Sequence, residues 1–190
     1  MKGNNKSTGL LVVVSAPSGA GKTSVLSEVM RKFPDINFSV SVTTRPPREG
    51  ERDGVNYFFV TDEEFEALIE RDDFVEWAVV HGNRYGTLKS TVQDALDNNR
   101  TIILDTDTVG AFNIKKHFPD TVLIFIAPPS QEALRERLES RNTESRELIQ
   151  KRLDAAPGEM ARMAEYDYIV LNETLSNAAA QIGSIIEANN

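Results

Sequence analysis

The chain has 190 residues, 40% of them hydrophobic, which suits one compact domain with a real core and leaves little room for two independent ones. A formal net charge of −8 argues against a protein that binds nucleic acid or an anionic membrane, because both favour positive surfaces. The sequence has no cysteine and its two histidines, His81 and His117, are isolated, which excludes disulfides and thiolate-held zinc and disfavours any histidine metal site.

Short apolar runs followed by helical patterns alternate along most of the chain. The longest, Leu10 to Val14, is far shorter than the roughly 20 residues of a membrane span, so we expect a cytoplasmic protein. Such a run is typical of a strand buried on both faces of a parallel sheet. A glycine-rich turn and a helical pattern follow it, and the pattern stops at Pro34. Strand-like runs at 101–104, 122–127 and 168–171 repeat this order, which predicts an α/β fold with a parallel sheet flanked by helices.

The stretch 38–86 breaks this rhythm. Apolar and polar residues alternate at its start, as in a strand, and further strand-like runs follow at 57–60 and 74–80. Thr61 and Glu64 have the spacing of a capping box, which predicts that a helix begins there. We therefore predict a small mixed α/β insert on the main sheet.

A second departure is the segment from Arg137 to Arg152, which is rich in arginine and glutamate and poor in large apolar groups. Its composition predicts a solvent-exposed helical hairpin. Pro157 follows a few residues later and is expected to end or kink the helix around it, because proline has no N–H to donate.

The turn after the first strand has the pattern of a phosphate-binding loop. Its residues are Ala16, Pro17, Ser18, Gly19, Ala20, Gly21, Lys22 and Thr23. In such loops backbone N–H groups and a helix N-terminus surround a phosphate, the lysine reaches the β and γ phosphates, and the Thr23 hydroxyl can ligate Mg²⁺. Ala16 stands where the pattern has its first glycine, and it requires only a negative φ. A simple glycine turn with Lys22 on the surface is the alternative, but the flanking strand and helix favour a nucleoside triphosphate site.

A phosphate acceptor is indicated within the insert. Arg45 and Arg48 flank a proline pair, and arginine binds phosphate through two parallel hydrogen bonds. Tyr57 and Tyr85 are phenolic donors that could complete the site. A stiff surface turn whose arginines meet only water would give the same local pattern. No Asn-Lys-x-Asp motif is present, so a GTPase is not indicated.

Several blocks of the sequence, in order, resemble guanylate kinase. They are 41–48, Glu51, 53–57, 74–78, 82–87, 103–107 and 127–130, and the match runs from about Leu10 to Asn172. The resemblance implies a P-loop nucleoside monophosphate kinase that phosphorylates GMP and dGMP to the diphosphates in purine nucleotide metabolism, with ATP as co-substrate and Mg²⁺ as cofactor. It also implies one domain over 1–190, divided into a core (10–37, 87–136 and 158–190), a GMP-binding insert (38–86) and a lid (137–157).

The resemblance also implies roles for individual residues. The GMP site would comprise Ser41, Arg45, Arg48, Tyr57, Glu76, Tyr85, Gly86, Thr87, Asp105 and Asp107. Of these, Ser41, Glu76 and Thr87 would read the base. That assignment agrees with the chemistry of guanine, whose N1–H and 2-amino donors and O6 acceptor are complemented by a carboxylate and a hydroxyl.

The donor side would include the loop 16–23, Arg137 and Asn172. The catalytic cations would be Lys22, Arg45, Arg137, Arg141 and Arg152. Asp105 and Asp107 stand at the C-terminal end of a predicted strand, where ligands bind in open α/β sheets. One of them would order water on Mg²⁺ and the other would contact the nucleotide, and the sequence leaves open which does which.

The chain departs from the family pattern at Val109, at Ser140 and Asn142 on either side of Arg141, and at Pro157, which concerns turnover more than identity. One alternative is a non-catalytic module that resembles the enzyme, but such modules usually lose phosphate-site residues that this chain keeps. Another is a kinase of a different phosphorylated acceptor such as a sugar phosphate, which would leave the base-reading set without a partner. The oligomeric state, monomer or homo-oligomer, stays open.

Overall fold

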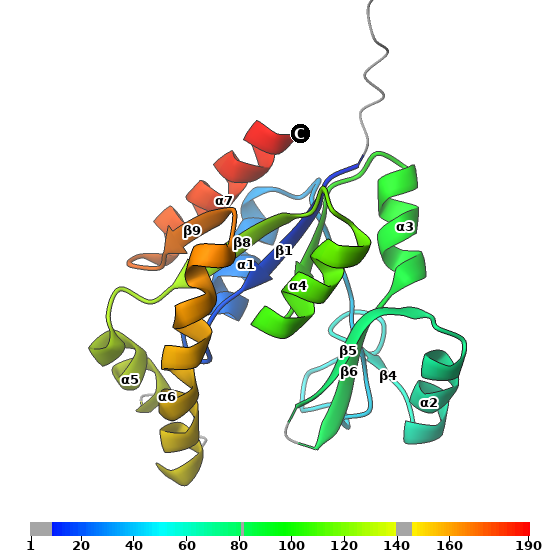
Figure 1. The fold of residues 1–190 in the computed structure, drawn as a ribbon, viewed down its shortest axis with the longest axis horizontal. Helices are drawn as coiled ribbons and strands as arrows, with labels where there is room; N and C mark the ends of the chain where they lie inside the picture. Colours follow the sequence, from blue (N-terminus) through cyan, green and yellow to red (C-terminus); the bar gives the residue numbers. More distant parts are fainter. Residues whose placement is uncertain (1–8, 81, 140–145) are drawn as a thin grey trace, which may run out of the picture.

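The computed structural model describes residues 9–80, 82–139 and 146–190, which form two sheets surrounded by helices (Figure 1). The elements, in chain order, are β1 (Leu11–Ser15), α1 (Lys22–Lys32), β2 (Asn37–Phe38), β3 (Val42–Thr43), β4 (Phe58–Phe59), α2 (Asp62–Glu70), β5 (Phe74–Val80), β6 (Asn83–Leu88), α3 (Lys89–Asp97), β7 (Ile102–Asp105), α4 (Thr108–His117), β8 (Val122–Ala127), α5 (Gln131–Glu139), α6 (Arg146–Ala161), the 3₁₀ helix η1 (Arg162–Glu165), β9 (Tyr168–Leu171) and α7 (Leu175–Asn189).

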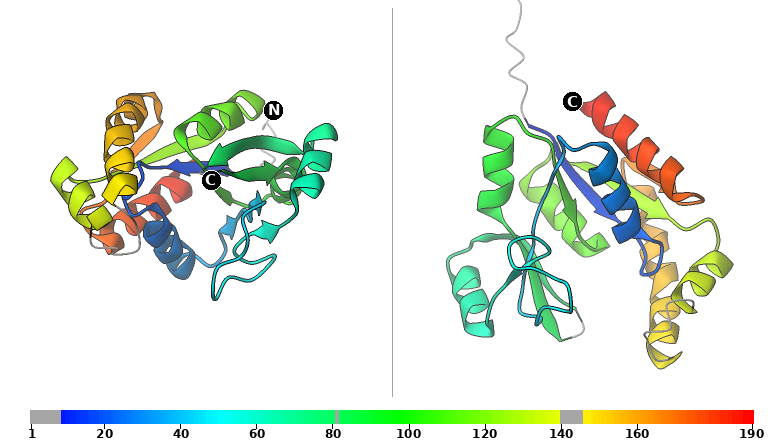
Figure 2. Two further views of the ribbon diagram at one scale, coloured as in Figure 1. Left: turned by 90° about the horizontal axis from the view of Figure 1, so that it is seen from below. Right: turned by 180° about the vertical axis from the view of Figure 1, so that it is seen from behind.

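The main sheet is parallel and has the strand order β2-β7-β1-β8-β9. Its central strand β1 is buried on both faces, as its apolar run predicted, although it begins one residue later than expected. Side chains of β1 alternate between two cores. Val12 and Val14 pack toward α1 and α7, whereas Val13 packs toward α3 and α4. Figure 2 shows these helices on opposite faces of the sheet, so the expected α/β layering is confirmed.

The second sheet is mixed and has the order β4-β3-β6-β5. Helix α2 covers it through Phe65, whose ring stacks on Phe74 with centroids 4.6 Å apart. The predicted capping box begins α2: the backbone N–H of Glu64 donates to the Thr61 hydroxyl at 3.1 Å, and that of Thr61 donates to the Glu64 carboxylate at 2.8 Å. The alternating stretch before it is not a single strand, however, because Phe38 ends β2 of the main sheet and Val42 begins β3 of the second.

Of the expected effects of Pro157, an end of the helix is wrong, and the expected exposure of 137–152 is only partial. Helix α6 does not end at Pro157 but continues to Ala161. Ala156 is buried and Leu153 packs against the core beside it, and this apolar packing compensates for the hydrogen bond that an exposed proline cannot make. The segment expected to be exposed is also partly internal, since Leu138 of α5 is only 1% exposed.

None of the helices that the structure describes combines the length and the apolar character needed to cross a membrane. The positions of His81 and of residues 140–145 lie outside the described residues, so the expectations for Arg141 and its neighbours stay predictions.

Helix α7 approaches α1 closely at Gly183. A Cβ atom there would overlap the ring of Phe33, which follows α1, whereas a Cβ at Gly158 in α6 would meet nothing within 4 Å. We expect Gly183→Ala to lower the free energy of unfolding by about 1 to 3 kcal/mol, because the packed ring must be displaced. Gly158→Ala is the matched control, and should be neutral or stabilising by up to about 1 kcal/mol. Urea unfolding of both variants measures this, and equal effects would contradict the packing argument.

Candidate active site

The loop between β1 and α1 presents an anion-binding helix end. Gly19 and Gly21 have φ values of 89° and 91°, a left-handed conformation that glycine adopts without strain. Gly21 is the N-cap of α1, and no side chain caps the helix there. No acidic residue lies in the first turn either, so its backbone N–H groups and its positive potential remain available for a phosphate.

Two side chains, Arg137 and Asn172, form a clamp on the Ala20 carbonyl of this loop. The Ala20 carbonyl accepts hydrogen bonds from Arg137 Nη1 at 3.0 Å and from Asn172 Nδ2 at 2.7 Å. Arg137 Nη2 also donates to the Asn172 carbonyl at 2.8 Å. The structure therefore brings together the two residues that were expected on the donor side, and it places them against the loop itself, from α5 and from the end of β9.

Lys22 reaches across to the end of β7. Its ammonium group forms an ion pair with Asp105 and donates to the Thr106 carbonyl at 3.1 Å. Asp107 lies at the same edge of the sheet but caps α4, where its Oδ1 accepts from the Gly110 N–H at 2.7 Å. The two aspartates are thus close together, as the sequence indicated, and they already have different partners.

One functional candidate was missed by sequence reasoning. Glu159 of α6 accepts a hydrogen bond from the Ser18 N–H of the loop at 3.3 Å. Burial raises the pKa of this carboxyl, while the Ser18 bond and the charge of Lys22 act in the opposite direction. The two partners are 141 residues apart in sequence, and no motif links them.

The arginine turn of the second sheet is tied down by an acid. Arg45 Nη2 lies 2.9 Å from Glu51 Oε1, and its guanidinium carbon lies 5.3 Å from the centroid of the Tyr57 ring. The hydrogen bond from Arg45 lowers the pKa of Glu51. Arg48 donates its backbone N–H to Glu51 Oε2 at 2.7 Å and is itself exposed. Arg45 is therefore not a surface arginine that meets only water.

Tyr57 and Tyr85 lie beside this turn, with their ring centroids 5.9 Å apart. Burial raises the pKa of the Tyr57 hydroxyl, and the charge of Asp105 adds to that effect. The Tyr57 hydroxyl beside the arginine turn is therefore influenced by the charge at the end of β7, where Lys22 is also bound. Ser41 precedes β3, and its carbonyl accepts from the Phe58 N–H at 2.9 Å. The contact of its hydroxyl with a base stays a prediction.

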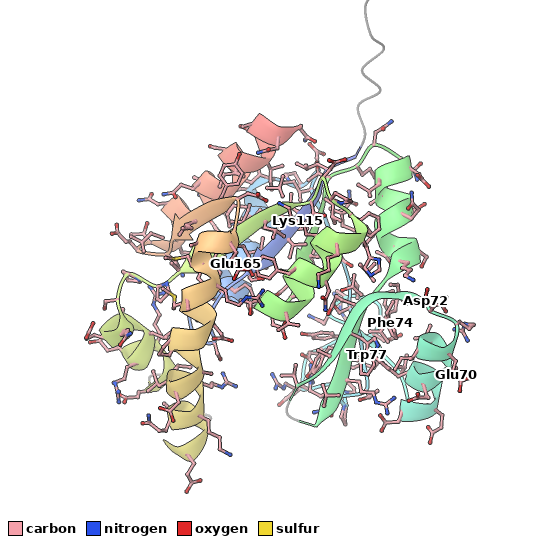
Figure 3. All side chains as sticks on the ribbon, viewed as in Figure 1. Glu70, Asp72, Phe74, Trp77, Lys115 and Glu165 are labelled. Atoms are coloured by element: carbon pink, nitrogen blue, oxygen red, sulfur yellow. The ribbon has the colours of Figure 1, made fainter. Side chains whose placement is uncertain are left out.

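Glu76 and Thr87 are paired across strands β5 and β6. The Thr87 hydroxyl donates to Glu76 Oε1 at 2.9 Å. Burial raises the pKa of Glu76 to about 7; hydrogen bonds from Thr87 and Thr106 and the charge of Lys22 lower it, and Asp107 raises it. Gly86, next to Thr87 on β6, faces the Phe74 ring, since a Cβ there would be 2.6 Å from it. Figure 3 labels Phe74 and Trp77, which lie on the same strand as Glu76 and contact α2.

The geometry thus links Lys22 of the phosphate loop, through Thr106, to the Glu76 carboxyl of the second sheet, and comparison with known proteins identifies this arrangement. A family model described as Guanylate kinase matches residues 8–189. The chain belongs to the guanylate kinase family. The resemblance seen in its sequence blocks is therefore confirmed.

Guanylate kinases of several bacteria are similar to the chain over nearly its whole length. The guanylate kinase of Syntrophotalea carbinolica is 49% identical over 183 residues, which cover 96% of this chain and 87% of the relative. That of Thermotoga maritima is 47% identical over 180 residues, with 95% and 87% covered. The crystal structure of guanylate kinase from Anaplasma phagocytophilum has a TM-score of 0.79 at 35% identity, and covers 96% of this chain and 87% of that one.

The guanylate kinase fold accounts for both sheets, and the described residues hold most of the predicted site. Arg152 lies on α6 and is half-buried, and Val109 is exposed in the first turn of α4. Arg141 lies outside the described residues. Two residues that were given no role from the sequence, Glu159 and Thr106, contact the site through the loop and through Glu76 respectively.

The raised pKa of Glu76 makes a stability prediction. The folded chain keeps a proton on Glu76 up to about pH 7, whereas the ordinary pKa is 4.5, so this group's stabilising contribution is full below pH 4.5 and is lost as pH rises from there through about 7. Relative to the parent, Glu76→Gln should therefore gain about 2 kcal/mol in free energy of unfolding between about pH 5.5 and pH 8. Urea unfolding at both pH values measures it. Glu70→Gln, on the exposed end of α2, controls for net charge, and a gain independent of pH would contradict the prediction.

Proposed function

We propose that the chain transfers the γ-phosphoryl group of ATP to a phosphate oxygen of GMP or dGMP, in line, and releases ADP and the nucleoside diphosphate. The observation that supports this best is the Glu76–Thr87 pair, whose carboxyl feels the charges of both Lys22 of the phosphate loop and Asp107. The proposed sites for the donor and the acceptor nucleotide are then next to each other. Transfer between two bound anions needs positioning and charge neutralisation, and no general base is required because the acceptor is already ionised.

The donor phosphates are assigned to the loop 16–23. The uncapped first turn of α1 offers N–H donors, and Lys22 exchanges its Asp105 partner for the β and γ phosphates when ATP binds. The clamp of Arg137 and Asn172 on Ala20 keeps the loop in its binding conformation, so little order must be gained on binding.

The acceptor is assigned to the second sheet. Arg45, Arg48, Tyr57 and Tyr85 take the GMP phosphate, with Glu51 holding the arginine turn in place beforehand. Glu76 accepts from the N1–H and 2-amino groups of guanine, and Ser41, Thr87 and Gly86 complete the base pocket. Adenine would place a lone pair against the carboxylate, which disfavours AMP.

Mg²⁺ fits this donor set. The Thr23 hydroxyl is in the first turn of α1, and the Asp105 or Asp107 carboxylate can hold a coordinated water at the same sheet edge. No cluster of three or more acidic, histidine or cysteine residues occurs among the described residues, which agrees with a metal that arrives with its phosphates. The ion would neutralise charge on the phosphates, and Arg137, Arg141 and Arg152 would supply the rest.

Closure of two parts over the substrates would exclude water. We assign the GMP-binding insert to 38–86 and the lid to 137–157, and place the remaining residues in the core. Their closure would keep water away from the γ-phosphoryl group and so prevent hydrolysis of ATP. The departures at Ser140 and Asn142 are proposed to slow closure, and Val109 is proposed to lose the contact that a glutamine amide would make. A cytoplasmic location agrees with the substrates, and the oligomeric state is left open.

The function is tested by ADP release from ATP and Mg²⁺ with each of GMP, AMP, CMP and UMP. We expect GMP to be preferred by at least about 10²-fold in kcat/KM, since a base-specific hydrogen-bond set discriminates strongly. A preference for AMP would refute the assignment of Glu76. No turnover with any of the four would support a non-catalytic binding module instead.

Lys22→Met should reduce phosphoryl transfer by at least about tenfold without unfolding the chain, because the ammonium group neutralises charge in the transition state and is not part of the core. The ADP-release rate and far-ultraviolet circular dichroism are compared with the parent. Lys116→Met, at the exposed end of α4, is the control and should retain full activity. Activity above a tenth of the parent in the Lys22 variant would remove the lysine from the mechanism.

A further inference from the structure

Thr106 contacts both Lys22 of the phosphate loop and the surroundings of Glu76 in the second sheet. It directly follows β7, and its backbone N–H points to the Val14 carbonyl at 3.4 Å. Its own carbonyl accepts from Lys22 Nζ at 3.1 Å. The main chain of Thr106 therefore contacts the donor side, while its side chain is turned to the other half of the site.

The side chain of Thr106 meets Glu76 over the first turn of α4. A Cβ atom at Gly110 would overlap the Thr106 hydroxyl and would lie 2.9 Å from Glu76 Oε2. Both groups therefore converge on one point, where only a glycine leaves room for them. Because Gly110 is in the first turn of α4, the carboxylate also lies near a helix N-terminus, which favours negative charge.

The neighbours of Glu76 show what this contact does. Thr87 from β6 donates to Oε1, and the Thr106 hydroxyl lies on the Oε2 side, where its interaction with the carboxyl lowers the pKa of Glu76. Of the charged groups around it, Lys22 lowers its pKa and Asp107 raises it. The first turn of α4 presents no acidic side chain. Two hydroxyls and one ammonium group therefore oppose the effects of burial and of Asp107.

We propose that Thr106 is a positioning residue for base recognition, whose hydroxyl orients Glu76 and holds it ionised while its carbonyl holds Lys22. The inference rests on the base-reading role proposed for Glu76. Guanine needs an acceptor with both oxygens free of protons, because it presents two adjacent donors. Losing the Thr106 hydroxyl should therefore weaken GMP binding only at pH values where Glu76 becomes protonated. ATP binding should be unchanged, since any residue at this position keeps the carbonyl.

The test is Thr106→Val, which keeps the branched shape and removes the donor. The NMR titration midpoint of the Glu76 carboxyl in the free protein should rise by about one pH unit, the size expected for one hydrogen bond to a charged group. The ionised fraction near pH 7 then falls, so KM for GMP should rise about fivefold there and by less than about 1.5-fold at pH 8.5. KM for ATP should change by less than about twofold.

Two further variants sharpen the result. Thr106→Ser keeps the hydroxyl and should restore the titration and the pH profile of KM for GMP. Thr121→Val removes a buried hydroxyl that donates to the Phe118 carbonyl, at the opposite edge of the main sheet, and should change neither. An unmoved midpoint in Thr106→Val, or a defect in GMP binding of equal size at both pH values, would overturn the proposal.

The failure of the base-reading role itself is distinguishable. Glu76→Gln should reduce discrimination between GMP and IMP, which lacks only the 2-amino group, by about 10- to 100-fold in kcat/KM. If that ratio is unchanged, Glu76 does not read the base, even where the titration shows that Thr106 donates to it. A midpoint that shifts in Thr106→Val without any change in KM for GMP would confine Thr106 to holding Glu76 and overturn its part in recognition.

Discussion

The site depends on the complete burial of β1. Val12, Val13 and Val14 have no exposed surface, so the strand contacts a core on each face and cannot slide without moving a side chain from one core to the other. Its parallel pairing with β7 and β8 then fixes where each neighbour ends. Because parallel strands end at the same edge, the phosphate loop after β1 and the acids after β7 are brought together there.

Electrostatics at this edge follows from pairing rather than from net charge. The chain as a whole carries −8, yet the cations that serve the site lie next to carboxylates, as Lys22 does with Asp105 and Arg45 with Glu51. Each pair holds its cation in place. An anionic ligand can then displace the carboxylate from the cation or bind the cation beside it. The local field is therefore suited to phosphate even though the protein is acidic.

The sequence predicted those parts of the molecule that local rules decide. The apolar run of β1, the capping box at Thr61 and the glycine loop were all confirmed because neighbouring residues determine them. The same local rules allowed the helix to end at Pro157, which it does not, and packing of the adjacent Ala156 accompanies its continuation. They also joined β2 and β3 into one strand, because alternation does not reveal which sheet each part belongs to.

Site residues divide in the same way. Lys22 and Arg45 belong to patterns with known spacing, whereas Thr106 acquires its contact only when Gly110 brings α4 against β5. Glu159 depends on a partner 141 residues away, which no spacing rule covers. Such contacts are properties of the packed chain, and only coordinates reveal them.

The bond from Ser18 to Glu159 has a mechanical consequence. Helix α6 lies largely within the segment 137–157 proposed as the lid, and just beyond that segment it carries Glu159, whose carboxylate accepts a hydrogen bond from the phosphate loop. Because Glu159 near the C-terminal end of α6 is bonded to the loop, a displacement of the N-terminal end of α6 would be transmitted to the loop. By thermodynamic reciprocity, ordering of the loop by a donor nucleotide would change the preferred position of α6 by the same coupling free energy. On the proposed assignment of the lid, binding of a donor nucleotide at the loop and the position of the lid would therefore be coupled through α6.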